Sequence, residues 1–182
     1  MFDTDLRLMI KSKFNELNIN QFDYFLAYQL WIIFYKNEDY KQEVYEFRDN
    51  ISLPISVVGK GAVVINCLSV RNSWVGAHSA LDGAIKVHNC TVLSDLEQFT
   101  SVREGVIVEN SILQWGSKIR GSAIVSDSLI MEVSSARKHA KIKYGIIAPN
   151  TDIYEGEVTS SLVGPYVGFH HQSMLIGAIW PD

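Results

Sequence analysis

Apolar side chains recur every three or four positions along the first fifty residues, in two runs separated by Asn18-Ile19-Asn20. This spacing predicts two α-helices, with the Asn-Ile-Asn segment as the break and N-cap between them. We therefore expect residues 1–50 to form an N-terminal helical hairpin whose apolar stripe packs on another surface as a cap. The apolar residues are Leu6, Met9, Ile10, Phe14 and Leu17 in the first run, and Phe22, Phe25, Leu26, Leu30, Ile33, Tyr40, Val44 and Phe47 in the second.

After Pro54 the helical spacing ends, and a small residue recurs two places before an aliphatic one. Residues two apart on a β-strand point to the same face, so each pair places one small and one branched side chain inward. The pattern predicts short strands separated by tight corners. The pairs are Ser56/Val58, Ala62/Val64, Ser73/Val75, Ser79/Leu81, Cys90/Val92, Ser111/Leu113, Ser117/Ile119, Ser128/Ile130, Ala140/Ile142, Gly145/Ile147, Thr151/Ile153, Ser161/Val163 and Ser173/Leu175.

A longer period overlies this pattern, because Leu113, Ile130, Ile147 and Val163 follow one another at spacings of 17, 17 and 16 residues. Three short faces make one coil of that length, and a repeat of this kind is typical of a solenoid. We therefore predict a mainly β fold in which residues 55–182 form a parallel β-helix of about seven coils, left-handed and built from hexapeptide repeats. A right-handed parallel β-helix is the alternative, although its repeats are longer and less regular.

Asparagine or aspartate stands immediately before an inward small residue at several corners. These residues tolerate the left-handed backbone conformation of a sharp corner, so we interpret them as turn residues rather than as a ligand-binding ladder. The spacing from Cys90 to Ser111 is 21 residues, four more than a coil, which predicts a loop that bulges out between Ser94 and Arg103. The corner residues are Asn66, Asn72, Asn89, Asn110 and Asp127.

Composition and charge narrow the classes of partner. The formal net charge of -4 disfavours a nucleic-acid partner, because a phosphate backbone is bound by a basic surface. No apolar run reaches the length of roughly 18 residues that a membrane span needs. Asp3 and Asp5 stand where a signal peptide would be basic, and Cys67 and Cys90 form no CxxC pair. We expect a cytoplasmic protein with neither a nucleic-acid nor a membrane partner.

Val75-Gly-Ala-His-Ser-Ala80 fits the hexapeptide pattern of an aliphatic residue, glycine, two free positions and a small residue. The region from Ser56 to Trp180 therefore resembles the hexapeptide-repeat superfamily. That superfamily includes acyltransferases of the lipid A and serine O-acetyltransferase type, γ-class carbonic anhydrases and the C-terminal domains of sugar-nucleotide pyrophosphorylases. The resemblance is specific for the fold and not for the chemistry.

The segment from Glu155 to Gln172 resembles a narrower group, an uncharacterised bacterial family of hexapeptide-repeat proteins described as a domain of unknown function or as pyrophosphorylase-like. In that family the chain continues past a Trp-Pro motif into further glycine-rich coils. Here the sequence stops at Trp180-Pro181-Asp182, with no capping helix after the last coil. We therefore expect the β-helix to be truncated at its C-terminal end.

His170 and His171 are the candidate catalytic residues. Gly164-Pro165 and Gly168 mark turns beside them where a ligand could approach the backbone, although the same residues are explained equally well as corner residues. The resemblance implies a histidine that acts as general base on an acceptor hydroxyl or amine. Consecutive residues on a strand face opposite sides, so His170 and His171 are not expected to share a metal unless a turn intervenes, and we predict no metal site.

Arg137, Lys138 and Lys141 belong to a basic cluster that we assign as the candidate substrate-binding site. Such a cluster can receive a phosphate or the pyrophosphate of coenzyme A, and a solvated charged face is the alternative interpretation. Among the other histidines, His78 occupies a free position of the hexapeptide and is expected to point outward. His88 and His139 are expected to be solvated surface residues.

Two functional hypotheses follow from these residues. The first is an acyltransferase-like or sugar-nucleotide-pyrophosphorylase-related transferase, a homotrimer with His170 or His171 as base, acting on a small sugar or acyl substrate. Its cofactor is not identified by the sequence, with acetyl-CoA or another acyl-CoA as the candidate. The second is a non-catalytic β-helix that acts as a scaffold, an oligomerisation module or a regulatory module of a larger protein. No GxGxxG or P-loop motif is present, so the chain does not resemble the nucleotidyltransferase half of such a protein.

Overall fold

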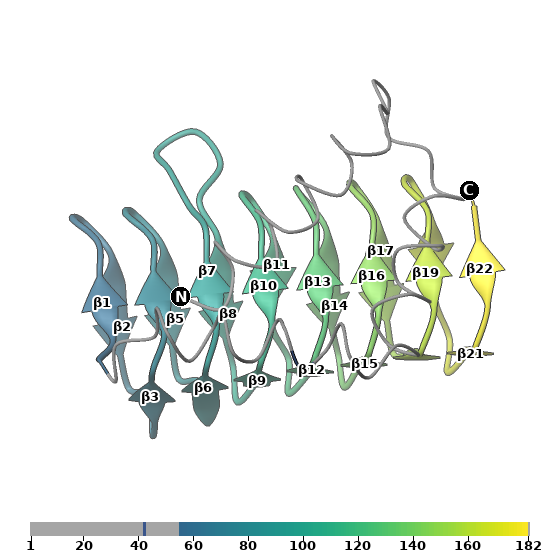
Figure 1. Cartoon of the computed structure of the whole chain (residues 1–182), viewed down its shortest axis with the longest axis horizontal. Coiled ribbons are helices and arrows are strands. Elements are labelled where there is room, and N and C mark those ends of the chain that lie inside the picture. Colours follow the sequence, from purple (N-terminus) through teal and green to yellow (C-terminus); the bar gives the residue numbers. More distant parts are fainter. Residues whose placement is uncertain (1–41, 43–54, 182) are drawn as a thin grey trace. The chain divides into compact units, whose positions relative to one another are not determined.

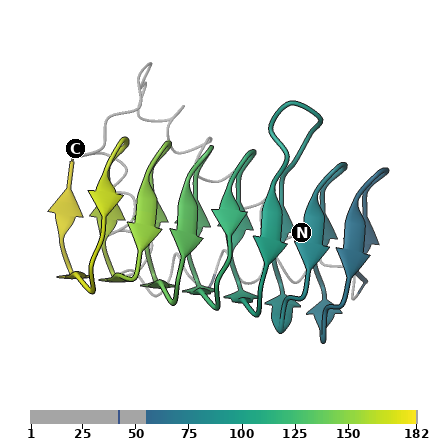
Figure 2. The ribbon, with the colours of Figure 1, turned by 180° about the vertical axis from the view of Figure 1, so that it is seen from behind.

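The computed structural model describes residue 42 and residues 55–181, and the latter form a parallel β-solenoid of about seven coils. Each coil passes through three sheets, and successive coils stack side by side along the solenoid (Figure 1). Figure 2 shows the same stack from behind. The predicted helical hairpin over residues 1–50 falls outside the described residues. In the described part of the chain, no helix is long and apolar enough to cross a membrane.

The three sheets, named A, B and C, contain only parallel strand pairs between neighbouring coils. Sheet A holds β1 (Val57–Val58), β4 (Trp74–Val75), β7 (Thr91–Val92), β10 (Ile112–Leu113), β13 (Leu129–Ile130), β16 (Ile146–Ile147), β19 (Leu162–Val163) and β22 (Ile179–Trp180). Sheet B holds β2 (Val63–Ile65), β5 (Ala80–Asp82), β8 (Ser101–Arg103), β11 (Lys118–Ile119), β14 (Ser135–Arg137), β17 (Asp152–Tyr154) and β20 (Gly168–Phe169). Sheet C holds β3 (Val70–Arg71), β6 (Lys86–His88), β9 (Ile107–Glu109), β12 (Ile124–Ser126), β15 (Lys141–Lys143), β18 (Glu157–Thr159) and β21 (Met174–Ile176).

The register confirms the long period of the sequence. Leu113 pairs with Ile130, Ile130 with Ile147, and Ile147 with Val163, each one coil further along sheet A. The shorter spacing before Val163 arises at the corner between sheets B and C. Two residues separate β17 from β18 there, whereas three separate β14 from β15.

The core is the interior of the solenoid, filled by the predicted small and aliphatic pairs. Leu113, Ile130 and Ile147 are completely buried, and burial of each such side chain contributes about 2 kcal/mol relative to exposure. The first coil departs from this pattern, because Val58 is 53% exposed although it occupies an inward position. No described coil precedes Val58 to cover it.

Serine is frequent at the small inward positions because its hydroxyl satisfies a backbone amide of the next coil. Cys90 N–H donates to Ser73 Oγ at 3.1 Å, and Ser128 N–H donates to Ser111 Oγ at 3.1 Å. Gly145 N–H likewise donates to Ser128 Oγ at 2.9 Å. These amides lie at corners, where the strand ladder is interrupted, so the hydroxyls prevent buried unsatisfied donors.

The structure confirms the predicted corner residues. Asn66, Asn72, Asn89, Asn110 and Asp127 all have positive φ, between 46° and 55°. The side chains of Asn89, Asn110 and Asp127 also contact one another along the stack. Asn89 Nδ2 donates to Asn110 Oδ1, and Asn110 Nδ2 donates to Asp127 Oδ1, both at 3.0 Å. The turn interpretation therefore accounts for these residues, with the side-chain ladder adding polar contacts at the corner.

The predicted bulge is a loop between β7 and β8, which projects from the stack in Figures 1 and 2. Asp95 Oδ1 accepts hydrogen bonds from the backbone amides of Glu97 at 2.9 Å and Gln98 at 2.7 Å, which orders the turn at the loop tip. Thr100 Oγ1 donates to the Leu93 carbonyl at 2.6 Å and closes the base of the loop.

Candidate functional site

The corner between sheets B and C brings the two predicted site groups together. Arg137 ends β14 and pairs in register with Tyr154 at the end of β17. Phe169 of β20 pairs with Ile153, so His170 follows at the same height as Tyr154 on the next coil. The stacked coils therefore place cationic, aromatic and imidazole side chains on one ridge. We name this group the B–C corner cluster, consisting of Arg137, Lys138, Asp152, Tyr154, His170 and His171.

Arg137 is held by Asp152. Its Nε donates to Asp152 Oδ1 at 3.0 Å and to Oδ2 at 3.1 Å, and its Nη2 also contacts Oδ2. Burial raises the pKa of Asp152, but hydrogen bonds from Arg137 and Ser135 and the charge of Arg137 outweigh it, so that the pKa lies below its usual value. The hydrogen bond to Asp152 raises the pKa of Arg137. The pair is therefore ionised at neutral pH and fixes the guanidinium.

Tyr154 lies at the centre of the cluster, with two cations against it. The Cζ atom of Arg137 is 5.2 Å from the centre of the Tyr154 ring, and Lys138 Nζ is 4.7 Å from it. Lys138 Nζ also donates a hydrogen bond to the Tyr154 hydroxyl, and this bond is the main cause that raises the pKa of Lys138. Both geometries lie within the range of cation–π interactions.

His170 and His171 lie in a turn after β20, where His171 has a φ of 62°. The rule that consecutive strand residues face opposite sides therefore does not apply, and their ring centres are 6.0 Å apart. The ring of His170 lies 5.5 Å from the Tyr154 ring. A Cβ atom on Gly168 would come within 2.9 Å of His170 Nε2, so glycine leaves room for this ring.

Within the described residues, no group of three or more His, Cys, Asp or Glu side chains could hold a metal ion.

The remaining predicted residues lie outside the cluster. Lys141 begins β15 of sheet C, in register with Ile124 and Glu157, so it projects from a sheet face rather than from the corner. His139 is exposed at the corner with a φ of 63°. His78 is half-buried at a corner between sheets A and B, where its ring lies against Gly61.

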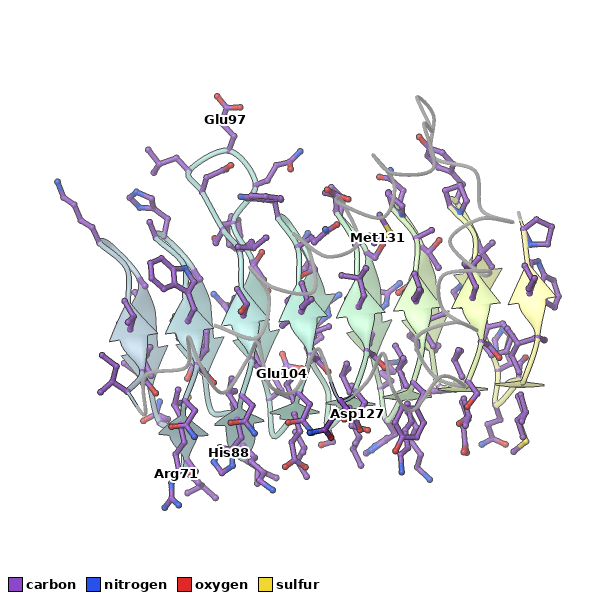
Figure 3. The ribbon with its side chains drawn as sticks, in the orientation of Figure 1. Arg71, His88, Glu97, Glu104, Asp127 and Met131 are labelled. Carbon is purple, nitrogen blue, oxygen red and sulfur yellow. The ribbon has the colours of Figure 1, made fainter. Side chains whose placement is uncertain are left out.

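His88 is a candidate that sequence reasoning missed. Its Nε2 shares a hydrogen bond of 2.7 Å with Ser69 Oγ. Burial, followed by the charges of Lys86 and Arg71, lowers the pKa of His88 against the opposing effect of Glu109. Arg71 and His88 project from sheet C in Figure 3. The sequence signal for this contact is the separation of 19 residues between Ser69 and His88. It equals one coil of 17 residues plus the two-residue step between neighbours on one strand face.

The comparisons with known proteins identify a family without an assigned activity. The family model described as a domain of unknown function, DUF4954, matches residues 15–181. No protein with curated function matches the chain. The match includes every described strand of the solenoid.

Proposed function

Because the chain belongs to the DUF4954 family, whose description assigns no function, we propose a role from its geometry. The protein is a left-handed hexapeptide-repeat solenoid related to the acyl and sugar-nucleotide transferases, and it binds an anionic ligand at the B–C corner cluster. One observation carries this proposal. Arg137 and Lys138 of one coil and His170 of another converge on Tyr154, which lies on the coil between them.

The cations support recognition of a phosphate or pyrophosphate group. Lys138 is exposed, so its ammonium group can move from the Tyr154 hydroxyl to an incoming anion. Asp152 holds Arg137 in place through Nε and Nη2, which leaves the Nη1 hydrogens and the second Nη2 hydrogen of a fixed guanidinium for phosphate oxygens. The charge of Asp152 offsets that of Arg137, which reduces the net positive charge that Arg137 offers to an anion.

His170 is the better candidate for a general base than His171. Its imidazole lies against the Tyr154 ring, in space that Gly168 leaves open because glycine has no side chain. His170 is half-buried, whereas His171 is exposed. A base must be held near the proton that it removes, so a positioned ring favours the role. In the proposed reaction His170 takes the proton of an acceptor hydroxyl or amine as that oxygen or nitrogen bonds to the acyl carbonyl carbon of the thioester. The thioester C–S bond then breaks, and coenzyme A leaves as the thiol after its sulfur takes the electron pair and the proton from His170.

Titration of the full chain with acetyl-CoA by isothermal calorimetry tests the proposal. Lys138→Ala should weaken binding about fivefold, because it removes one charge contact with the anion. Lys60→Ala, an exposed lysine at a corner of the first coil, is the control and should leave binding unchanged. His170→Ala should retain binding and lose acyl transfer. Absence of binding to acetyl-CoA and to a uridine diphosphate sugar would overturn the proposal.

A non-catalytic scaffold is the second candidate, and the ion pair between Arg137 and Asp152 favours it. A guanidinium neutralised by an adjacent carboxylate also serves as a purely structural link between coils. In this case the chain forms a homotrimer whose mass, measured by sedimentation equilibrium, is unchanged by Lys138→Ala. No small anion would then shift the signals of Tyr154 or His170 in an NMR titration.

A further inference from the structure

Ser69 and His88 form a hydrogen-bonded pair on the outer face of sheet C, away from the B–C corner cluster. Ser69 immediately precedes β3, and His88 ends β6 on the next coil. Val70 pairs with Val87, and Arg71 pairs with His88, so Ser69 reaches diagonally across the ladder. The distance from Ser69 Oγ to His88 Nε2 is 2.7 Å, which is within reach for proton transfer.

Charged residues around His88 favour its neutral form. Arg71 lies beside it on β3 and Lys86 lies two residues earlier on β6, and both charges lower its pKa in addition to burial. Glu109 lies in register on β9 and acts in the opposite direction, but its Oε1 is 2.6 Å from Lys86 Nζ and is partly neutralised by it. With the hydrogen of the neutral ring on Nδ1, Nε2 accepts the hydrogen bond from the Ser69 hydroxyl.

The hydrogen bond between Ser69 and His88 is not needed to satisfy buried polar groups. Inward serines such as Ser111 and Ser128 are buried, and their hydroxyls hydrogen-bond backbone groups. Ser69 and His88 are both only partly buried, so water could serve either group instead. Their partial exposure also leaves the hydroxyl within reach of a small molecule. The arrangement has the two components of an activated nucleophile, a hydroxyl and an adjacent base.

We propose that Ser69 is a nucleophile activated by His88 and that it accepts an acyl group from a small ester carrying a negative charge. Ser69 Oγ forms a bond to the carbonyl carbon while its proton passes to His88 Nε2. The ester C–O bond then breaks, and the leaving oxygen takes the electron pair and receives the proton from His88. Arg71 attracts the anionic ester to this face. The site shares no residue with the B–C corner cluster, so the two proposals stand or fail separately.

The experiment uses acetylsalicylate as an anionic acetyl donor and follows the full chain by intact mass and peptide mapping. We expect one acetyl group on Ser69. Ser69→Ala should abolish this modification, and His88→Ala should slow it roughly 100-fold, the usual contribution of a general base. Ser126→Ala removes another outward serine of sheet C, on β12, and should leave the rate unchanged.

Two further measurements test the role of His88 as the base and the role of Arg71 as the cation that attracts the ester. The rate should already be at its plateau at neutral pH, because the pKa of His88 lies below its usual value of 6.5. Arg71→Gln should slow acetylation by acetylsalicylate about fivefold and leave the rate with phenyl acetate, its uncharged analogue, unchanged. Acetyl groups on lysines with Ser69 unmodified, or equal rates for the His88→Ala variant and the unaltered chain, would overturn the proposal. Circular dichroism of each variant confirms that the fold is retained.

Discussion

Arg137 and Tyr154 lie in register on neighbouring coils, and the guanidinium carbon of Arg137 is 5.2 Å from the centre of the Tyr154 ring. The same guanidinium donates to Asp152, which lies two residues before Tyr154 on β17. One side chain of β14 therefore contacts both ends of the β17 strand. The contacts of Arg137 position the Tyr154 ring, against which His170 lies. The ion pair between Arg137 and Asp152 therefore contributes to the geometry of the candidate site as well as to the stacking of neighbouring coils.

Arg137→Ala should destabilise the solenoid by about 1–2 kcal/mol in urea unfolding at pH 7, because it leaves the carboxylate of Asp152 partly buried without its cation. The pKa of Asp152 is lowered in the folded state, so its contribution is complete above the unfolded value, near 3.8, and is lost as the pH falls through the folded pKa. The difference between variant and parent should therefore shrink below pH 4. A difference that stays constant down to pH 2 would contradict this assignment.

Ser128→Ala should cost about 1–3 kcal/mol, because the hydroxyl accepts the hydrogen bond from the buried Gly145 amide and no other acceptor replaces it. Ser117→Ala is the matched control. Ser117 Oγ is buried and makes no hydrogen bond within the described part of the chain, so its removal should be neutral or stabilising. Urea unfolding of both variants measures the difference. Equal losses would show that the hydroxyl ladder does not stabilise the corners.

Much of the solenoid follows from the sequence because its repeat is a direct consequence of stacking. The spacing of Leu113, Ile130 and Ile147 predicts their register, and the asparagine corners and the loop after β7 are placed correctly. These features depend on the backbone period and on the residue types that tolerate a left-handed corner. The helical hairpin stays a prediction, since it lies outside the described residues.

The candidate sites follow less completely from the sequence. The period shows which residues stack, but it does not show how far a long side chain extends from a corner. The sequence therefore predicts separate roles for Arg137 and His170, although both reach Tyr154 in the structure. The pairing of Ser69 with His88 is diagonal, so it combines the coil period with a step along the strand. The sequence pattern identifies serine only as a small residue, whereas its hydroxyl accepts a hydrogen bond from a backbone amide of the next coil.

Val133 adopts a left-handed conformation, with a φ of 58°, at a corner between sheets A and B. A β-branched residue is strained there, at a cost of about 1–2 kcal/mol. Its side chain is 46% exposed, so little burial is lost on its removal. Val133→Gly should therefore raise the free energy of unfolding by about 1 kcal/mol after the entropy of glycine is deducted.

Gly116 is the control for this prediction, because it occupies the equivalent corner position one coil earlier and also has a positive φ, of 72°. Gly116→Ala should lower the free energy of unfolding by about 1 kcal/mol through the same backbone preference. The nearest atom to the added Cβ would be Val133 Cγ2 at 3.4 Å, so the effect does not arise from a severe clash. Thermal unfolding of the two variants should give midpoints that move in opposite directions.

Cys90 should be inert to iodoacetamide in the folded chain. It is completely buried, and burial raises the pKa of its thiol to about 12, so the reactive thiolate is scarce at pH 8. Cys67 is half-buried in the first described coil and should react first. In a Cys67→Ser variant the remaining thiol should react only as fast as the middle coils open, so its rate should rise with urea along the unfolding curve. Rapid labelling of Cys90 in the absence of urea would mean that the solenoid opens locally between β7 and its neighbours, because no other route brings a reagent to this inward position.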